Sequence, residues 1–190
     1  MKSATISTSL DRRQIRDFQY TFRKLRKCLY IYAADTGRCG LGIFTAKSLK
    51  KGEPVIVDLD GDYYEQVVSY GDLQECKISI DITFQVGLDA YKLPTGSLED
   101  FTNHSCEPNT GIRLVPRGTI IIALRDIDAH EELTYDYSTY LNNSYETIDC
   151  RCGSNKCRGV IGNFKTLPEE LKRKYLDLGI VGDFVTERAS

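Results

Sequence analysis

The sequence predicts one mixed domain of the α+β class, mostly β, with helices near its two ends. Two observations support this prediction. Between residues 29 and 137, short apolar segments alternate with turn residues, whereas the stretches before and after them carry apolar residues at helical spacing. At 190 residues, 41% of them hydrophobic, the chain is long enough for one domain with a substantial core.

Residues 1–28 are expected to form an N-terminal helical segment. Asp11 is a suitable N-cap, and apolar residues recur at helical spacing at Ile15, Phe18, Phe22, Leu25 and Leu29. Basic residues cover the other faces of this helix. A solvated outer face explains them better than a surface for an acidic partner.

Short strands are expected from residue 29 to about residue 137. Apolar residues alternate with others at Val55, Val57 and Leu59, and again at Ile78, Ile80, Ile82 and Phe84. Residues 112–115 and 120–124 flank Pro116-Arg117-Gly118, which predicts a hairpin. Lys51-Gly52 and Asp60-Gly61-Asp62 mark further turns.

A second helix is expected near the C-terminus, in the tail of residues 163–190. Pro168 opens a run with Leu171, Tyr175 and Leu178 on one side, and Gly179 is placed to end it.

Composition excludes several functional classes. The net charge of −2 gives no basic field for nucleic acid, so no direct nucleic-acid binding is expected. The polar N-terminus is no signal peptide, and no apolar run is long enough for a membrane helix. Seven cysteines, an odd number, fit a closed disulfide framework poorly. A soluble protein of a reducing compartment, cytoplasm or nucleus, is expected.

The cysteines predict a metal site. Cys150, Cys152 and Cys157 form a C-x-C-x4-C cluster, and Cys106 stands alone earlier in the chain. Four thiolates would close a tetrahedral, structural zinc site and order residues 149–160, which have almost no apolar side chains to bury. The alternative is that Cys106 is an ordinary buried thiol and the triplet binds a metal elsewhere. The remaining cysteines are expected to be core or neutral thiols, namely Cys28, Cys39 and Cys76.

Three further segments hold candidate site residues. Gly40-Leu41-Gly42 permits a ligand to approach the backbone closely, Asn103-His104 precedes Cys106, and Tyr135-Asp136-Tyr137 follows Glu131-Glu132-Leu133-Thr134. Each has a plainer interpretation when taken alone. The glycines could form a bare turn, the Asn-His pair could be two satisfied polar side chains, and the tyrosines could form one face of a buried strand.

Taken together and in this order, these segments resemble the SET-domain family of protein-lysine methyltransferases. The resemblance covers roughly residues 26–159 and implies a SET domain over residues 29–140 followed by a zinc-binding post-SET segment over residues 141–162. It implies a fold of short β-sheets in which the N-H-S-C and E-L-T-Y-D-Y strands cross in a pseudoknot. Since no cysteine-rich cluster precedes the domain, a compact, stand-alone member is expected.

The resemblance also implies a cofactor and a set of roles. S-adenosylmethionine would be held by Arg38, Gly40, Leu41, Gly42, Asn103, His104 and Tyr137, and Zn²⁺ by Cys106, Cys150, Cys152 and Cys157. Tyr137 would be the catalytic tyrosine that orients the amine. Tyr135 would be the second catalytic residue, at the position of a tyrosine-or-phenylalanine switch, and predicts mainly monomethylation or dimethylation. Glu132 and Asp136 would be structural.

The implied reaction moves a methyl group to a lysine ε-amine, which must first lose its proton. Because a free lysine has a pKa of about 10.4, activity should rise toward alkaline pH. The substrate would be a lysine-containing protein, with a histone among the candidates. Two alternatives remain open: a non-catalytic SET-fold binding module, and a methyltransferase acting on a small amine or a free peptide.

Two regions depart from the family pattern or leave it undefined. Glu99-Asp100 stands where the family often has an alanine-arginine pair, and the insert over residues 61–86 carries no specificity signature. Tyr63, Tyr64 and Tyr91 are candidates to line a lysine channel, but core or rim positions are the default for them.

Overall fold

The computed structural model describes residues 30–59, 67–116, 118–142 and 147–186. The predicted N-terminal helix, Tyr63, Tyr64 and Cys28 lie outside these ranges. The strands are β1 (Ile31–Asp35), β2 (Leu41–Thr45), β3 (Pro54–Asp58), β4 (Val67–Val68), β5 (Phe84–Gly87), β6 (Ala90–Lys92), β7 (Asn103–His104), β8 (Thr110–Val115), β9 (Gly118–Ala123), β10 (Glu132–Tyr135), β11 (Ile148–Asp149) and β12 (Val160–Ile161). The α-helices are α2 (Tyr70–Cys76), α3 (Glu169–Asp177) and α4 (Asp183–Thr186). The mostly β class is confirmed.

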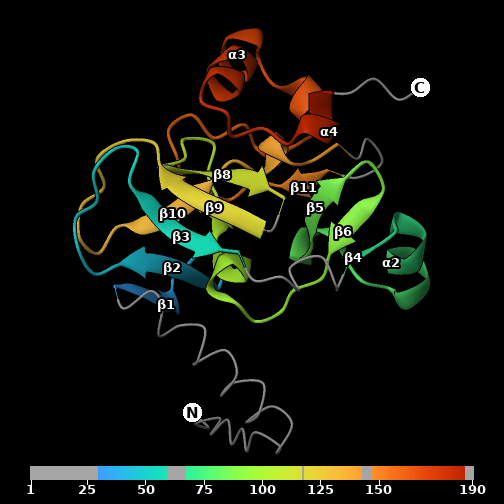
Figure 1. Cartoon of the computed structure of the whole chain (residues 1–190), viewed down its shortest axis with the longest axis horizontal. Coiled ribbons are helices and arrows are strands. Elements are labelled where there is room, and N and C mark those ends of the chain that lie inside the picture. The colour runs from blue at the N-terminus through green and yellow to red at the C-terminus, as the bar shows by residue number, and fades with distance from the viewer. Residues whose placement is uncertain (1–29, 60–66, 117, 143–146, 187–190) are drawn as a thin grey trace, which may run out of the picture.

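The strands form small sheets around one main core. Their orders are β1-β2-β10-β7, β3-β9-β8, β4-β6-β5 and β11-β12. In Figure 1, α3 and α4 lie together at the end of the molecule opposite β1 and β2, and α2 flanks the β4-β6-β5 sheet. Among the described helices, none combines the length and apolar character that a membrane span requires.

One strand pairing brings the two motif segments together. β7 and β10 pair in parallel, with Asn103 opposite Thr134 and His104 opposite Tyr135. The amide of Ser105 continues the pairing by donating to the Tyr135 carbonyl at 3.0 Å. Segments some thirty residues apart in the sequence therefore meet at one point of the fold.

Two predicted strands differ from the structure. The alternation at Val55 and Val57 does not mark one buried face, because Val55 is buried and Val57 is 49% exposed; the register shifts between Pro54 and Ile56. Residues 78–84 do not form one strand, since a short 3₁₀ helix occupies Ile80–Ile82. The capped helix α2 just before it was not predicted, although Ser69 and Asp72 form a capping box at its start.

The hairpin and the C-terminal helix are confirmed. β8 and β9 pair antiparallel from Thr110–Ala123 to Val115–Gly118. Pro168 caps α3, Tyr175 is its buried residue, and Gly179 follows with a φ of 62°, a left-handed conformation that glycine adopts without strain. Tyr175 thereby joins the main core together with Phe164, Ile180 and Phe184.

Candidate active site and thiolate cluster

The glycine-rich turn is a tight loop closed on itself. The Thr36 amide and hydroxyl both donate to the Gly40 carbonyl, at 2.8 and 3.0 Å, and Gly40 has a φ of 76°. A Cβ at Gly42 would lie 2.7 Å from a carboxylate oxygen of Glu132 and 2.8 Å from the amide nitrogen of Asn103. Gly42 is therefore required for the turn to approach the β7–β10 pair this closely.

Glu132 joins this turn to the rest of the site. Its carboxylate accepts from the Asn103 side-chain amide at 3.0 Å and from the Arg38 guanidinium at 2.9 Å. Asn103 also donates to the Leu41 carbonyl at 3.1 Å, and Arg38 donates to the Cys152 carbonyl at 2.7 Å. Four of the predicted cofactor residues, Arg38, Leu41, Gly42 and Asn103, are thus brought together, and Leu41 is 51% exposed.

The two tyrosines lie against each other at the end of β10. Their ring centroids are 4.7 Å apart, and the Tyr137 hydroxyl donates to the Thr102 carbonyl at 3.1 Å. Tyr135 is buried, with its ring edge-to-face against Phe84 at 6.3 Å. A phenol oxygen is therefore held at a backbone carbonyl, in a place where an amine could be oriented.

A pocket opens on the side of these tyrosines that faces the insert. Phe84, Thr83, Tyr135 and Tyr137 line it and also line a second, adjoining pocket. Tyr91, which was a candidate for this role, is buried at 2% exposure in a separate small core instead. Phe84 was missed because it was read as part of a regular strand, and only the folded insert turns its ring toward Tyr135.

The departure at Glu99-Asp100 forms a buried ion pair in the wall of the first pocket. Lys92, whose side chain is 4% exposed, lies 3.0 Å from a Glu99 oxygen, and the Thr119 hydroxyl donates to the other oxygen at 3.0 Å. Burial raises the pKa of Glu99, although the Lys92 ammonium opposes the shift. Both carboxylate oxygens of Glu99 have partners. We therefore assign the Lys92–Glu99 pair to the structure of the pocket wall and give it no catalytic role.

His104 turns its ring away from the glycine turn and toward the cysteines. Its Nδ1 accepts the Tyr137 amide at 3.2 Å, so the ring proton is on Nε2, which lies 3.3 Å from the Cys106 sulfur. Burial lowers the pKa of His104 to about 4, with Arg158 adding to the shift and Asp136 opposing it. His104 is therefore a neutral donor to Cys106.

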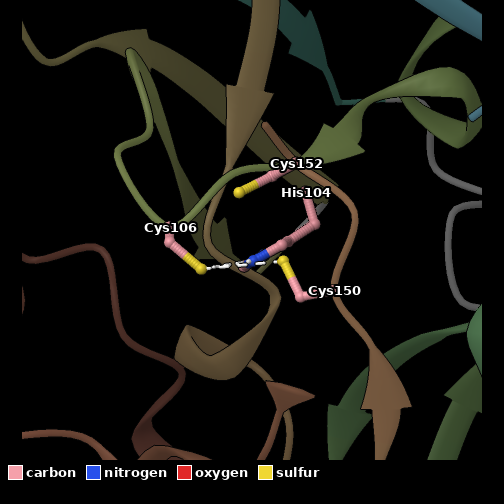
Figure 2. Close-up of side chains that lie close together, drawn as sticks. All are labelled: His104, Cys106, Cys150 and Cys152. Atoms are coloured by element: carbon pink, nitrogen blue, oxygen red, sulfur yellow. Dashed lines mark hydrogen bonds between the residues drawn. The ribbon is translucent and has the colours of Figure 1, made fainter. Parts of the chain in front are cut away.

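Three of the four predicted cysteines, Cys106, Cys150 and Cys152, converge together with His104, and Cys157 joins them through Cys150. Cys150 lies 3.7 Å from Cys106 and 3.6 Å from Cys157, sulfur to sulfur. With Zn–S bonds of about 2.3 Å, the sulfurs of a tetrahedral site are about 3.8 Å apart, so these distances fit such a site. Figure 2 shows His104, Cys106, Cys150 and Cys152 converging, and their possible ligand atoms all lie within 4.8 Å of one another.

Among the cysteines of the cluster, Cys152 has a lowered thiol pKa, whereas those of Cys106 and Cys150 are raised. Burial acts to raise the pKa of Cys152, but backbone hydrogen bonds from Cys106 and Ser154 lower it to about 7. Burial raises the pKa of Cys106 and of Cys150. Amides of Arg158 and Gly159 point at Cys106 and Cys157, at 3.4 and 3.5 Å from the sulfurs. The donor set suits Zn²⁺.

Of the cysteines expected to be core or neutral thiols, the two that the structure describes are not in the core. Cys39 and Cys76 are both exposed. Cys39 lies at the surface of the glycine turn, and Cys76 ends α2.

A buried carboxylate between the tyrosines was not assigned to the site by sequence. Asp136 has a fully buried side chain that Arg158 holds with two bonds of 2.8 Å, while the Tyr175 hydroxyl donates to it at 3.1 Å. Arg158 belongs to the cysteine segment and Tyr175 to α3. The spacing of Asp136, Arg158 and Tyr175 in the sequence does not predict that they meet, because only the folded chain brings them together.

Comparisons with known proteins agree with this geometry. The SET domain family model matches residues 40–138, more than half of the chain. Putative histone-lysine N-methyltransferase 1 of Plasmodium falciparum is 32% identical over 142 residues, which cover 69% of this chain and 2% of that protein. Histone-lysine N-methyltransferase TRX1 of Oryza sativa subsp. japonica is 32% identical over 145 residues, which cover 70% of this chain and 14% of that protein. This chain therefore spans a small part of either relative.

Solved structures share the fold. The methyltransferase domain of human SETMAR superposes with a TM-score of 0.53 at 24% identity, over 70% of this chain and 58% of that one. KRYPTONITE, in complex with mCHG DNA and SAH, superposes with a TM-score of 0.52 at 21% identity, over 69% of this chain and 28% of that one.

Proposed function

The chain belongs to the SET-domain family, and from this premise we propose that it is a protein-lysine N-methyltransferase that uses S-adenosylmethionine. One observation carries the proposal most directly: the Tyr137 hydroxyl lies 3.1 Å from the Thr102 carbonyl, beside Tyr135 and next to the β7–β10 pair that holds Asn103. A binding module would not need a phenol fixed in this way in the wall of a pocket.

The cofactor is proposed to bind at the glycine turn. Arg38, Gly40, Leu41, Gly42 and Asn103 surround the place where a ligand would meet the backbone, and the exposed Leu41 offers an apolar surface. His104 is assigned through its main chain, since its ring is engaged by Tyr137 and Cys106. When bound, S-adenosylmethionine supplies an electrophilic methyl group whose transfer breaks a carbon–sulfur bond and leaves S-adenosylhomocysteine.

Tyr137 is proposed to orient the attacking amine. A phenol with an ordinary pKa of about 10 is a poor base at neutral pH, so the tyrosine positions the nitrogen and the proton leaves to solvent beforehand. Entry of the lysine into a pocket lined by Phe84, Tyr135 and Tyr137 removes water from the amine and lowers its pKa. Most of the acceleration of methyl transfer then comes from aligning the lysine nitrogen with the methyl group.

The zinc ligands are proposed to be Cys106, Cys150, Cys152 and Cys157. His104 is the other candidate in the cluster, but its two ring nitrogens already pair with the Tyr137 amide and the Cys106 sulfur. As a donor to the Cys106 sulfur, it would stabilise the thiolate and connect the metal to the active site. Bound Zn²⁺ would hold residues 150–157 against Cys106, which lies just after β7. Such thiolates persist in a reducing compartment, cytoplasm or nucleus, which is the proposed location.

The substrate is proposed to be a lysine in a protein, with histone tails as the first candidates. The relatives above are named histone-lysine methyltransferases, and one related solved structure holds an H3(1-15) peptide. Tyr135 at the switch position leads us to propose mono- or dimethylation as the product.

The test is intact mass spectrometry of a panel of basic peptides and histones incubated with labelled S-adenosylmethionine at about pH 8.5, where more of the amine is neutral. We expect labelled lysine that disappears in Tyr137→Phe, whose affinity for S-adenosylhomocysteine stays within twofold of the parent. Cofactor binding without transfer to any protein or peptide would instead favour the binding module. Transfer only to free amines would favour the small-amine enzyme.

A further inference from the structure

We propose that Tyr175, on the C-terminal helix α3, is a positioning residue for methyl transfer that acts on Tyr137 through the carboxylate of Asp136. This inference rests on the function proposed above. It adds to the active site a residue that lies beyond residues 40–138, the part matched by the SET domain family model.

The first step of the argument is the place of Asp136 in the chain. It stands between Tyr135 and Tyr137, so its two peptide groups are shared with both tyrosines. Any rotation of Asp136 about its backbone therefore moves the Tyr137 ring. The Tyr137 amide is held from the other side by His104 at 3.2 Å.

The second step is the set of groups that fix the Asp136 side chain. Arg158 donates twice, at 2.8 Å each, and the Ser138 amide donates to Oδ1 at 3.1 Å. Tyr175 donates to Oδ2 at 3.1 Å. The side chain of Asp136 has no exposed surface, so water does not replace a lost donor there.

The third step is that Tyr175 is fixed independently of the cysteine segment. It is 1% exposed and belongs to the main apolar core, whereas Arg158 follows directly after Cys157. Burial and the Asp136 charge raise the pKa of Tyr175, so the hydroxyl keeps its proton and remains a donor. Tyr175 thus gives Asp136 one anchor that does not depend on the metal-binding tail.

A second contact between the same segments supports this assignment. The Gly182 amide, between α3 and α4, donates at 3.1 Å to the carbonyl of Thr139, the last residue of the 3₁₀ turn that begins at Tyr137. The C-terminal segment therefore meets the tyrosine segment at two points, on Asp136 and on Thr139.

The experiment compares steady-state kinetics of the parent chain and Tyr175→Phe on the H3(1–15) peptide, or on the best substrate of the panel. Rates are expressed per molecule that binds S-adenosylhomocysteine in calorimetry, so that unfolded protein is not counted. Because small misplacements of reacting groups are costly, we expect kcat to fall on the order of tenfold. The KM for S-adenosylmethionine should stay within twofold, and the zinc content per chain should not change.

The matched control is Tyr30→Phe, which removes a hydroxyl that donates to the Val55 carbonyl at 3.1 Å, away from Asp136. It should leave kcat unchanged. If Tyr175→Phe does not fold, Arg158→Lys tests the link from Asp136 to Tyr137 on which the proposal depends, since lysine keeps the charge but cannot make the paired bonds. The same split between kcat and KM is expected.

Each outcome decides the question. An unchanged kcat per binding-competent molecule in Tyr175→Phe, or in Arg158→Lys where that replaces it, overturns the positioning role while the proposed function stands. Equal loss in the variant and in Tyr30→Phe also overturns it. A parent chain that transfers nothing to the whole panel overturns the proposed function and this inference with it.

Discussion

Two segments follow the tyrosine strand, and they are held against it by different means. From residue 147 to residue 160, the side chains are exposed or half-buried, and none is buried. From residue 161 to residue 185, the chain buries Ile161, Phe164, Leu167, Tyr175, Ile180, Phe184 and Val185. The first segment makes polar contacts and, in the zinc site proposed above, would be held by its sulfur ligands, whereas the second depends on a packed apolar core.

Because of this difference, we expect the two segments to lose their structure under different conditions. Order in the cysteine segment should depend on metal binding, which contributes about 10 kcal/mol or more of apparent folding free energy in small thiolate modules. The C-terminal segment should stay folded as long as the main core does. Both segments meet at Asp136, where Arg158 arrives from one and Tyr175 from the other.

The largest effect should come from removing a metal ligand. In Cys152→Ser, we expect zinc loss and a fall in activity on the order of hundredfold, because residues 147–160 lose what holds them and Arg38 loses its Cys152 carbonyl partner. Near-ultraviolet circular dichroism should still report a folded core. The measurements are zinc content by atomic absorption and methyl transfer.

Cys76→Ser is the matched control, since Cys76 is exposed at the end of α2, outside the cluster. It should keep zinc and activity. If Cys152→Ser were metal-free and fully active, the cysteine segment would be self-supporting, and the difference between the two segments would disappear.

The next effect separates stability from function. Ile180 is 2% exposed, and its side chain fills the space beside Gly111, where an added Cβ would lie 2.7 Å from it. Ile180→Ala should lower the free energy of unfolding by about 3 kcal/mol, because it leaves a cavity in the core. Zinc content and activity per folded molecule at low temperature should hold.

Urea titration followed by circular dichroism measures the change, with Leu176→Ala as the control at a site that is 48% exposed. A loss of zinc in Ile180→Ala would contradict the independence of the two segments. So would equal destabilisation by both variants, since only Ile180 lies in the core.

The two segments also differ in how far sequence could predict them. The cysteine spacing predicted that sulfurs would gather in one cluster, and the helix signals at Pro168 and Gly179 placed α3 to within a residue or two. Sequence could not show that Tyr175 and Arg158 meet on Asp136, because that contact joins residues 22 and 39 positions away from the carboxylate. Short-range patterns carry no information on such contacts.

The insert was the least predictable region. Its isoleucines at alternate positions gave a strand pattern, yet the chain forms α2 and then a 3₁₀ turn over Ile80–Ile82. A capping box and the local packing of Leu73 and Ile80 outweighed the alternation. The tyrosine and glycine motifs were easier, since the residues of each are neighbours in the sequence.

A smaller effect should follow from cutting the link between the cysteine segment and the cofactor turn. Arg38 bridges the Glu132 carboxylate and the Cys152 carbonyl, and half of its side chain is exposed. Arg38→Ala should weaken S-adenosylhomocysteine binding roughly tenfold, because Glu132 and the turn lose one restraint. Calorimetry measures it, with the exposed Arg173→Ala on α3 as control. Equal affinities in both variants would mean that the two regions are not coupled through Arg38.

The smallest effect concerns the product and tests the tyrosines that both segments support. Tyr135 is buried against Phe84 and Tyr137, so Tyr135→Phe removes one hydroxyl while the ring can keep its packing. The space vacated by the oxygen should let a methylated amine rotate and accept a further methyl group. We expect activity within about threefold of the parent and a several-fold higher ratio of di- and trimethylated to monomethylated peptide, measured by mass spectrometry. An unchanged ratio would mean that the Tyr135 hydroxyl does not set the methylation state. Other side chains that line the pocket would then set it.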